Sequence, residues 1–223
     1  TGAVFALNAL SYAGIIIVLM RWQRTVPLTD LPAERFFGAL RQGVRFALHA
    51  PALQAAVVRG AGFFLFASAS WALLPLIVRN LPDGGPQAFG ILVAAIGVGA
   101  VLGALVLPAL RKKLSRDAQV ALASVLYALV LLGLASIDRL WPLAGVMTVA
   151  GVAWITILSS LQVAAQMALP NWVRSRGLAV FMAVFMGSMA LGSLVWGGMA
   201  QVLSINQSLI IASVGALAAT ALT

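Results

Sequence analysis

The chain has 223 residues, of which 62% are hydrophobic and 9% are charged, and its mean hydropathy is +1.06. Because soluble domains carry roughly 25% charged residues, this composition excludes an ordinary soluble domain and predicts an all-α membrane protein with several spanning helices. The net charge of +9 does not indicate a nucleic-acid partner, since the basic residues fall into short loops between apolar runs and form no basic face on a soluble fold.

Seven apolar runs, separated by polar turn-forming segments, are long enough to cross a bilayer, for which about 20 residues suffice. No charged segment or small-residue cleavage site precedes the first run, so we interpret it as a spanning helix rather than a signal peptide. We expect the chain to be an excerpt from a longer protein, because its first and last runs reach the two ends without a polar tail. The predicted spans are residues 2–20, 55–78, 88–110, 118–136, 141–167, 178–203 and 207–223.

The longest connection between spans follows the first one and contains an amphipathic segment. Phe36, Leu40, Val44 and Ala47 recur at helical spacing, with arginines elsewhere around the same helix. Such a helix is suited to the interface between membrane and water. The predicted organisation is one span in residues 1–20, a basic cytoplasmic linker in 21–54 and a six-helix transmembrane domain in 55–223.

The distribution of basic residues predicts the orientation, because Lys and Arg accumulate in cytoplasmic loops. Eleven basic residues fall in one set of alternating loops, and only Arg79 and Arg139 fall in the other. We therefore expect the chain to start outside the cell and to turn its basic loops to the cytoplasm. The eleven are Arg21, Arg24, Arg35, Arg41, Arg45, Arg111, Lys112, Lys113, Arg116, Arg174 and Arg176.

Polar residues share one side of the predicted span 141–167. Ser159, Gln162 and Gln166 follow one another at spacings of three and four residues, which places them on one face of a helix. Amides in hydrocarbon need hydrogen-bond partners, so these residues either join neighbouring helices or line a pathway. Trp154 of the same span either stacks on a planar ligand there or packs in the core.

The predicted spans 55–78 and 178–203 carry two further candidate faces. Ser68 and Trp71 lie in a row with Pro75, and a proline can bend a helix, as a gate or simply to fit its neighbours. In the second span the row consists of methionines, which tolerate varied apolar ligands but also serve as ordinary core. The three methionines are Met182, Met186 and Met189.

The charged candidates cluster at the predicted cytoplasmic ends. Arg59 lies close to a span interior, where it either snorkels to the headgroups or pairs with an acid outside the six-helix domain. All five carboxylates lie in loops, so a proton-binding carboxylate is expected outside this chain, the alternative being that Asp117 titrates. Further candidates for a cytoplasmic gate or anchor are Arg111, Lys112, Lys113, Arg174 and Arg176.

Small residues recur every four positions in two spans. This spacing lets helix backbones approach closely. The glycines expected to pack helices together are Gly99, Gly103, Gly192 and Gly197.

Catalytic and metal sites are not expected. Cysteine is absent and His49 is the only histidine, and one histidine makes no metal site. The sequence contains no phosphate-binding loop of the ATPase type, and no serine has a histidine near enough in the predicted topology for a catalytic triad. We therefore expect no enzymatic activity and no cofactor.

Four segments carry a resemblance to a known family: "FALNALSYAGIIIVLMRW" (5–22), "FFLFASASWALLPLIVR" (63–79), "GVGAVLGALVLPALRKKLSRD" (97–117) and "QMALPNWVRSRGLA" (166–179). Together with the arrangement of one span, a basic linker and six spans, they resemble the second part of a major facilitator superfamily transporter. The similarity is to the transmembrane secretion effectors, whose best-known member type is the enterobactin exporter. One departure is that no acid lies between Gly103 and the basic residues that begin at Arg111, where Asp117 could partly substitute.

The resemblance implies a major facilitator superfamily-type helical bundle of about seven transmembrane helices, namely helix six and the C-terminal six-helix half. It implies a bacterial inner-membrane exporter of a siderophore or drug-like compound that works by alternating access and proton antiport. Its partners would be the bilayer, the substrate and an N-terminal half of the same protein. The glycine-rich helices would lie at the seam between the halves, and residues 141–167 would line the central cavity.

Two other functions remain open at this point. A membrane-embedded enzyme that modifies lipid would need pairs of His, Asp or Glu at the membrane surface, and no such pair is present. A sensor or scaffold with transporter-like helices would not transport at all, and an intramembrane carboxylate in the first half would argue against it.

Overall fold

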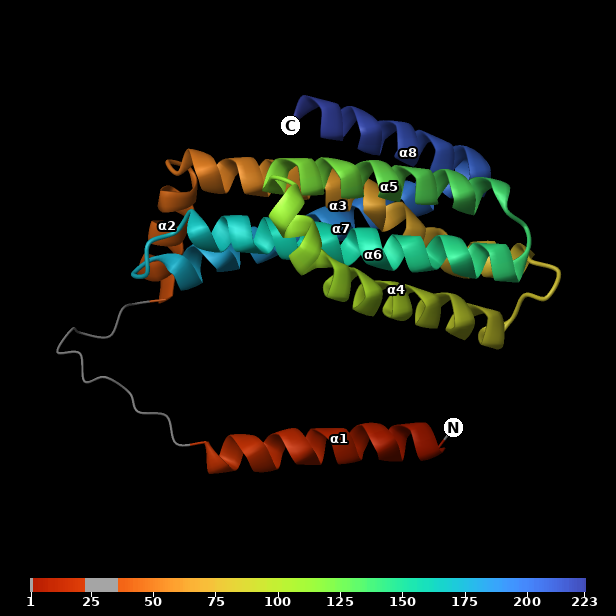
Figure 1. Ribbon diagram of the computed structural model, residues 1–223, viewed down its shortest axis with the longest axis horizontal. Helices are drawn as coiled ribbons and strands as arrows, with labels where there is room; N and C mark the ends of the chain where they lie inside the picture. The colour runs from red at the N-terminus through yellow and green to blue at the C-terminus, as the bar shows by residue number, and fades with distance from the viewer. Residues whose placement is uncertain (1, 23–35) are drawn as a thin grey trace. The chain divides into compact units, whose positions relative to one another are not determined.

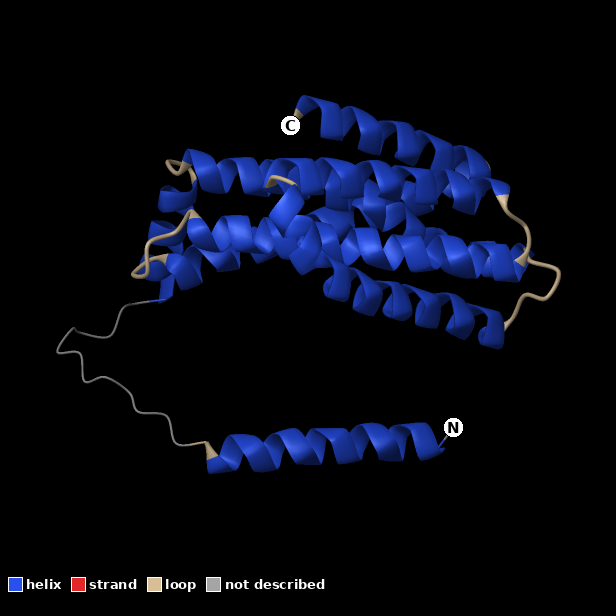
Figure 2. Ribbon diagram, in the orientation of Figure 1, coloured by secondary structure: helices blue, strands red, loops and turns tan. Residues whose placement is uncertain are grey.

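The computed structural model describes residues 2–22 and 36–223, which are helical apart from short connections (Figure 2). Helix α1 belongs to one compact unit and helices α2 to α8 belong to another. The amphipathic segment predicted from Phe36 onward is helix α2, whereas the first part of the linker lies outside the described residues. The helices are α1 (Gly2–Arg21), α2 (Phe36–Ala47), α3 (Pro51–Asn80), α4 (Pro86–Lys113), α5 (Arg116–Ser136), α6 (Leu140–Met167), α7 (Arg174–Val202) and α8 (Ile205–Leu222).

Six of the described helices, α3 to α8, are long and apolar enough to cross a membrane. They coincide with six of the seven predicted spans. The first predicted span is also helical, as α1, with a described apolar stretch of Phe5–Arg21. The predicted fold class, an all-α membrane bundle, is therefore confirmed.

All six spanning helices begin earlier than the sequence predicts, and two of them begin four residues earlier. Helix α3 begins at Pro51 rather than residue 55, because proline is favoured in the first helical turn, where its missing N–H is not needed. Helix α7 begins at Arg174 rather than residue 178. Arg174 and Arg176 thus belong to the first turn of α7 and not to the loop before it.

Consecutive helices from α3 to α8 run in opposite directions along the bundle (Figure 1). The most extensive contacts join α4 to α6, α3 to α7, α5 to α6 and α5 to α8. Apolar side chains fill the space between these helices; Phe64, Leu73, Leu131 and Ile157 are fully buried. The connection between α4 and α5 and the connection between α6 and α7 lie toward the same end of the bundle, so the basic residues of these segments share that side (Figure 1).

Glycines allow two pairs of helices to touch through their backbones. A Cβ atom at Gly99 of α4 would collide with the backbone of Thr148 in α6. A Cβ atom at Gly103 of α4 would collide with the Ile155 side chain of α6 and would lie 3.0 Å from the Val152 Cα atom. The contacts of these two glycines therefore lie inside the six-helix domain, between α4 and α6.

The two glycines of α7 that were predicted to pack helices together differ in their surroundings. A Cβ atom at Gly192 would collide with Ser68 and with the Leu65 carbonyl oxygen of α3. A Cβ atom at Gly197 would meet nothing within 4 Å in the described part of the chain. Gly192 thus belongs to the contact between α3 and α7, and Gly197 does not.

Candidate functional site

Aromatic side chains gather around Trp154, midway along α6. Its ring contacts aromatic rings from three other helices at centroid distances of 5.5 to 6.5 Å. Edge contacts of this kind stabilise aromatic pairs beyond the area that they bury. The neighbours of Trp154 are Phe63, Phe64 and Trp71 of α3, Tyr127 of α5 and Phe185 of α7.

The aromatic cluster extends from the core to the surface of the domain. Phe64 is fully buried, Trp154 is half-buried and Trp71 is 38% exposed. The centroids of the two tryptophan rings lie 6.0 Å apart with the planes at 65°. Trp71 therefore forms the exposed edge of the aromatic cluster, and Trp154 packs against it.

The one hydroxyl of the aromatic cluster is satisfied within the core. Tyr127 shares a hydrogen bond of 2.7 Å with Ser70, which also donates to the Ala67 carbonyl oxygen at 2.8 Å. A buried hydroxyl without a partner would destabilise this arrangement. The pair joins α3 to α5 and keeps Tyr127 in place against Trp154.

The polar residues predicted on one side of α6 differ in exposure. Gln162 is exposed, while Ser159 and Gln166 are half-buried. Ser159 accepts a hydrogen bond of 2.8 Å from the Arg111 guanidinium at the end of α4. The polar side of α6 thus continues into the basic end of α4, which the sequence alone did not connect.

Ser68 is placed differently from its predicted neighbours in α3. It is fully buried and donates to the Leu65 carbonyl oxygen at 2.7 Å. Its hydroxyl lies against Gly192 of α7. Ser68 therefore lies in the interface between α3 and α7, whereas Trp71, less than one helical turn away, reaches the surface.

The predicted methionine row of α7 borders the aromatic cluster. Met182 and Met186 are exposed and Met189 is half-buried. Phe185, on the adjoining side of α7, is buried against Phe64 with ring centroids 4.2 Å apart. Phe185 and the methionines thus occupy neighbouring positions of α7, and methionine side chains adapt to varied apolar molecules.

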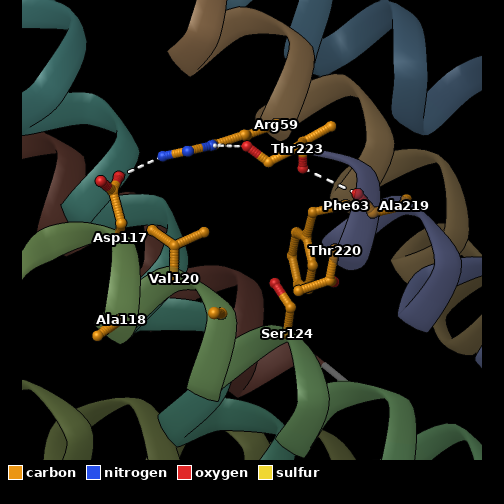
Figure 3. Close-up of a pocket in the computed structure, with 10 residues that line it drawn as sticks. Arg59, Phe63, Asp117, Ala118, Val120, Ser124, Ala219, Thr220 and Thr223 are labelled. Atoms are coloured by element: carbon orange, nitrogen blue, oxygen red, sulfur yellow. Dashed lines mark hydrogen bonds and ion pairs between the residues drawn. The ribbon is translucent and has the colours of Figure 1, made fainter.

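Arg59 forms an ion pair with Asp117, which lies in the first turn of α5 (Figure 3). Its Nε also donates to the backbone oxygen of Thr223 at 2.7 Å. The acid that Arg59 meets in this structure is Asp117 of the same domain, and their ion pair joins α3 to α5; pairing with an acid of the N-terminal half stays a prediction. The side chains of Arg59 and Asp117 are 28% and 76% exposed, so solvent screens their attraction.

A pocket of about 320 Å³ lies beside this ion pair. Helices α3, α5 and α8 line it with apolar side chains and hydroxyl groups, and Figure 3 shows their arrangement. No local pattern predicted this pocket, because its walls come from segments more than 50 residues apart. The lining residues are Arg59, Phe63, Asp117, Ala118, Val120, Ala121, Ser124, Ala219, Thr220 and Thr223.

The other charged candidates lie at the same end of the bundle. Lys112, Lys113 and Arg174 are exposed. Arg176 donates to the side-chain oxygen of Gln42 at 2.8 Å and so ties the start of α7 to α2.

Comparison with known families identifies one match. A family model described as "Transmembrane secretion effector" matches residues 1–223, the whole length of the chain. A search of curated proteins found no match.

Proposed function

Because the chain belongs to the transmembrane secretion effector family of major facilitator transporters, we propose that it forms part of an exporter for a small amphipathic molecule. It is a multi-pass membrane protein of a transporter family, and such families are generally not enzymatic. The proposed location is the bacterial cytoplasmic membrane, with the basic end of the bundle on the cytoplasmic side.

The observation that carries the proposed substrate chemistry is the aromatic cluster that reaches the surface at Trp71. The Trp71 and Trp154 rings offer stacking surfaces, and Met186 offers an adaptable apolar side chain. Gln162 adds an exposed amide on the same helix as Trp154. These groups suit a flat molecule with hydrogen-bonding substituents, such as an aromatic siderophore or a drug-like compound.

The proposed mechanism is alternating access. An N-terminal half of the same protein would face this six-helix domain, and the two halves would rock about a central site. The described carboxylates, Asp83, Asp117 and Asp138, lie in loops or in the first turn of a helix. The carboxylate that carries a coupling proton through the membrane would therefore belong to the N-terminal half, and transport would be proton antiport.

Efflux from cells tests this proposal. Cells that lack the transporter are supplied with the complete protein, loaded with a fluorescent aromatic dye or a labelled siderophore, and followed for loss of the compound. We expect efflux that stops with a protonophore and falls at least tenfold in Trp154→Leu. Trp141→Leu is the matched control, because Trp141 is exposed in the first turn of α6, at the end of the bundle opposite the basic residues.

The outcomes separate the alternatives. Equal accumulation in cells with and without a well-expressed protein would rule out export of these compounds and favour a scaffold. Efflux that is equally reduced in Trp154→Leu and Trp141→Leu would refute the role assigned to the aromatic cluster. Conversion of membrane lipid in place of efflux would indicate an enzyme.

A further inference from the structure

Helix α2 is fixed against the first turn of α7 by two contacts, both with Arg176. Gly43 lies so close to Arg176 that a Cβ atom there would lie 2.9 Å from the Arg176 Cβ. Arg176 also donates to Gln42 at 2.8 Å. Since an amphipathic helix in the interface need not bind its own protein, this docking requires an explanation beyond membrane attachment.

Between α2 and the loop that precedes α7 lies a pocket of about 480 Å³. Its volume is in the range of sites that hold small ligands. Phe46 and Trp172 form its aromatic walls, with ring centroids 5.8 Å apart and planes at 84°. The residues that line it are Gln42, Arg45, Phe46, His49 and Trp172.

The polar groups of the pocket are suited to an anion. Arg45 carries a positive charge, and no ion pair with a carboxylate is present among the described residues at this site. The side-chain oxygen of Gln42 accepts from Arg176, which leaves its amide N–H groups as donors. His49 Nδ1 lies 2.7 Å from the Arg45 carbonyl oxygen; because a carbonyl only accepts, Nδ1 donates, and Nε2 is left for a hydroxyl group.

The position of the pocket selects a lipid over a soluble anion. Trp172 is exposed, and tryptophan favours the headgroup level of a bilayer. The pocket lies at the basic end of the bundle, and basic pockets on the cytoplasmic side of membrane proteins bind anionic headgroups. A phospholipid would place its phosphate at Arg45, a glycerol hydroxyl at Gln42 or His49, and the start of its acyl chains against Phe46 and Trp172.

We propose that the pocket between α2 and the turn before α7 binds the headgroup of an anionic phospholipid from the cytoplasmic leaflet. The bound lipid holds the connection between the two halves against the six-helix domain. This inference depends on the membrane orientation and is independent of what the protein transports, so lipid binding and export succeed or fail separately.

Native mass spectrometry of the complete protein tests this site. The protein is exchanged into detergent with equal amounts of phosphatidylglycerol and phosphatidylcholine, and the lipids that remain bound are counted. We expect a preference for phosphatidylglycerol that falls about fivefold in Arg45→Gln. Arg41→Gln is the matched control. It removes the same charge one helical turn before Arg45, and Arg41 does not line the pocket.

A second variant and a soluble competitor complete the test. Arg45→Lys keeps the charge and should retain most of the preference, provided that all variants unfold at the same temperature. Quenching of tryptophan fluorescence by brominated phosphatidylglycerol should decrease in Arg45→Gln and not in Arg41→Gln. Equal losses in Arg45→Gln and Arg41→Gln would overturn the proposal, and so would complete displacement of the lipid by glycerol phosphate.

Discussion

The backbone contact between α4 and α6 yields a sharp prediction for Gly99→Ala. The new Cβ would collide with the Thr148 carbonyl oxygen and would lie 2.8 Å from the Thr148 carbonyl carbon. These are backbone atoms of a helix, so no change of rotamer relieves the collision. Ordinary contact begins at 3.4 Å, and α4 must therefore move away from α6 by at least about 0.6 Å.

The expected cost follows from the nature of the two surfaces. Overpacking of a core typically costs about 1–3 kcal/mol, and the upper value applies here because backbone meets backbone. Alanine recovers up to about 1 kcal/mol through its higher helix propensity. The net loss in the free energy of unfolding for Gly99→Ala is then about 2 kcal/mol, which shifts the unfolding equilibrium about thirtyfold.

Unfolding in mixed micelles, followed by circular dichroism as the fraction of denaturing detergent rises, measures this loss. Gly97→Ala is the control, because a Cβ atom two residues earlier on the same helix would meet nothing within 4 Å. Gly99→Ala should unfold at a clearly lower detergent fraction than Gly97→Ala. If the two variants unfold together, the close contact between α4 and α6 does not exist as described.

Two other contacts give predictions of smaller size. Asp117→Asn removes the charged partner of Arg59. Because Asp117 is 76% exposed, the free energy of unfolding should fall by less than about 1 kcal/mol. Thermal unfolding at low and high salt measures this loss, and a salt-independent loss of several kcal/mol would contradict the prediction. Ser213→Ala removes a buried hydrogen bond of 2.8 Å to the Ala128 carbonyl oxygen, between α8 and α5, and should cost about 0.6–2 kcal/mol in the same assay. Thr220→Val, which removes only a bond within α8, should cost less, and the reverse order would be inconsistent with the structure.

The sequence was sufficient to predict the elements because their signals are local. Apolar runs of spanning length and basic turns mark the six long helices, and helical spacing marks α2. The errors at helix ends are local too. Pro51 starts α3 early because it fits the first turn, and Arg174 starts α7 where the sequence suggested a loop.

The contacts between helices could not be predicted in the same way. A helix that is apolar all round carries no periodic signal that tells which face meets which neighbour. Ser68 and Trp71 share a predicted row, yet Ser68 is buried against Gly192 while Trp71 reaches the surface. The aromatic cluster around Trp154 likewise joins four helices, and aromatic residues near the middle of several spans were the only signal for it.

The pairing of charges shows the same limit. Arg59 and Asp117 were both predicted at the cytoplasmic end, but not as partners, since 58 positions separate them in the chain. Their pairing depends on how α3 and α5 pack, and this packing follows from side-chain shape rather than from charge pattern. Local sequence patterns therefore located the charged end of the bundle, while the packed fold determines which groups meet there.

Accessibility of the methionine face from both sides of the membrane tests alternating access most directly. Met186, near the middle of α7, is 56% exposed, and Leu129, near the middle of α5, is 55% exposed. The chain contains no cysteine, so Met186→Cys and Leu129→Cys can be labelled with thiol reagents that do not cross the membrane, in a complete transporter without other cysteines. We expect Met186→Cys to react from either side and Leu129→Cys to react from neither. Reaction of both positions alike, or of Met186→Cys from one side only, would contradict a central pathway that opens alternately to the two sides.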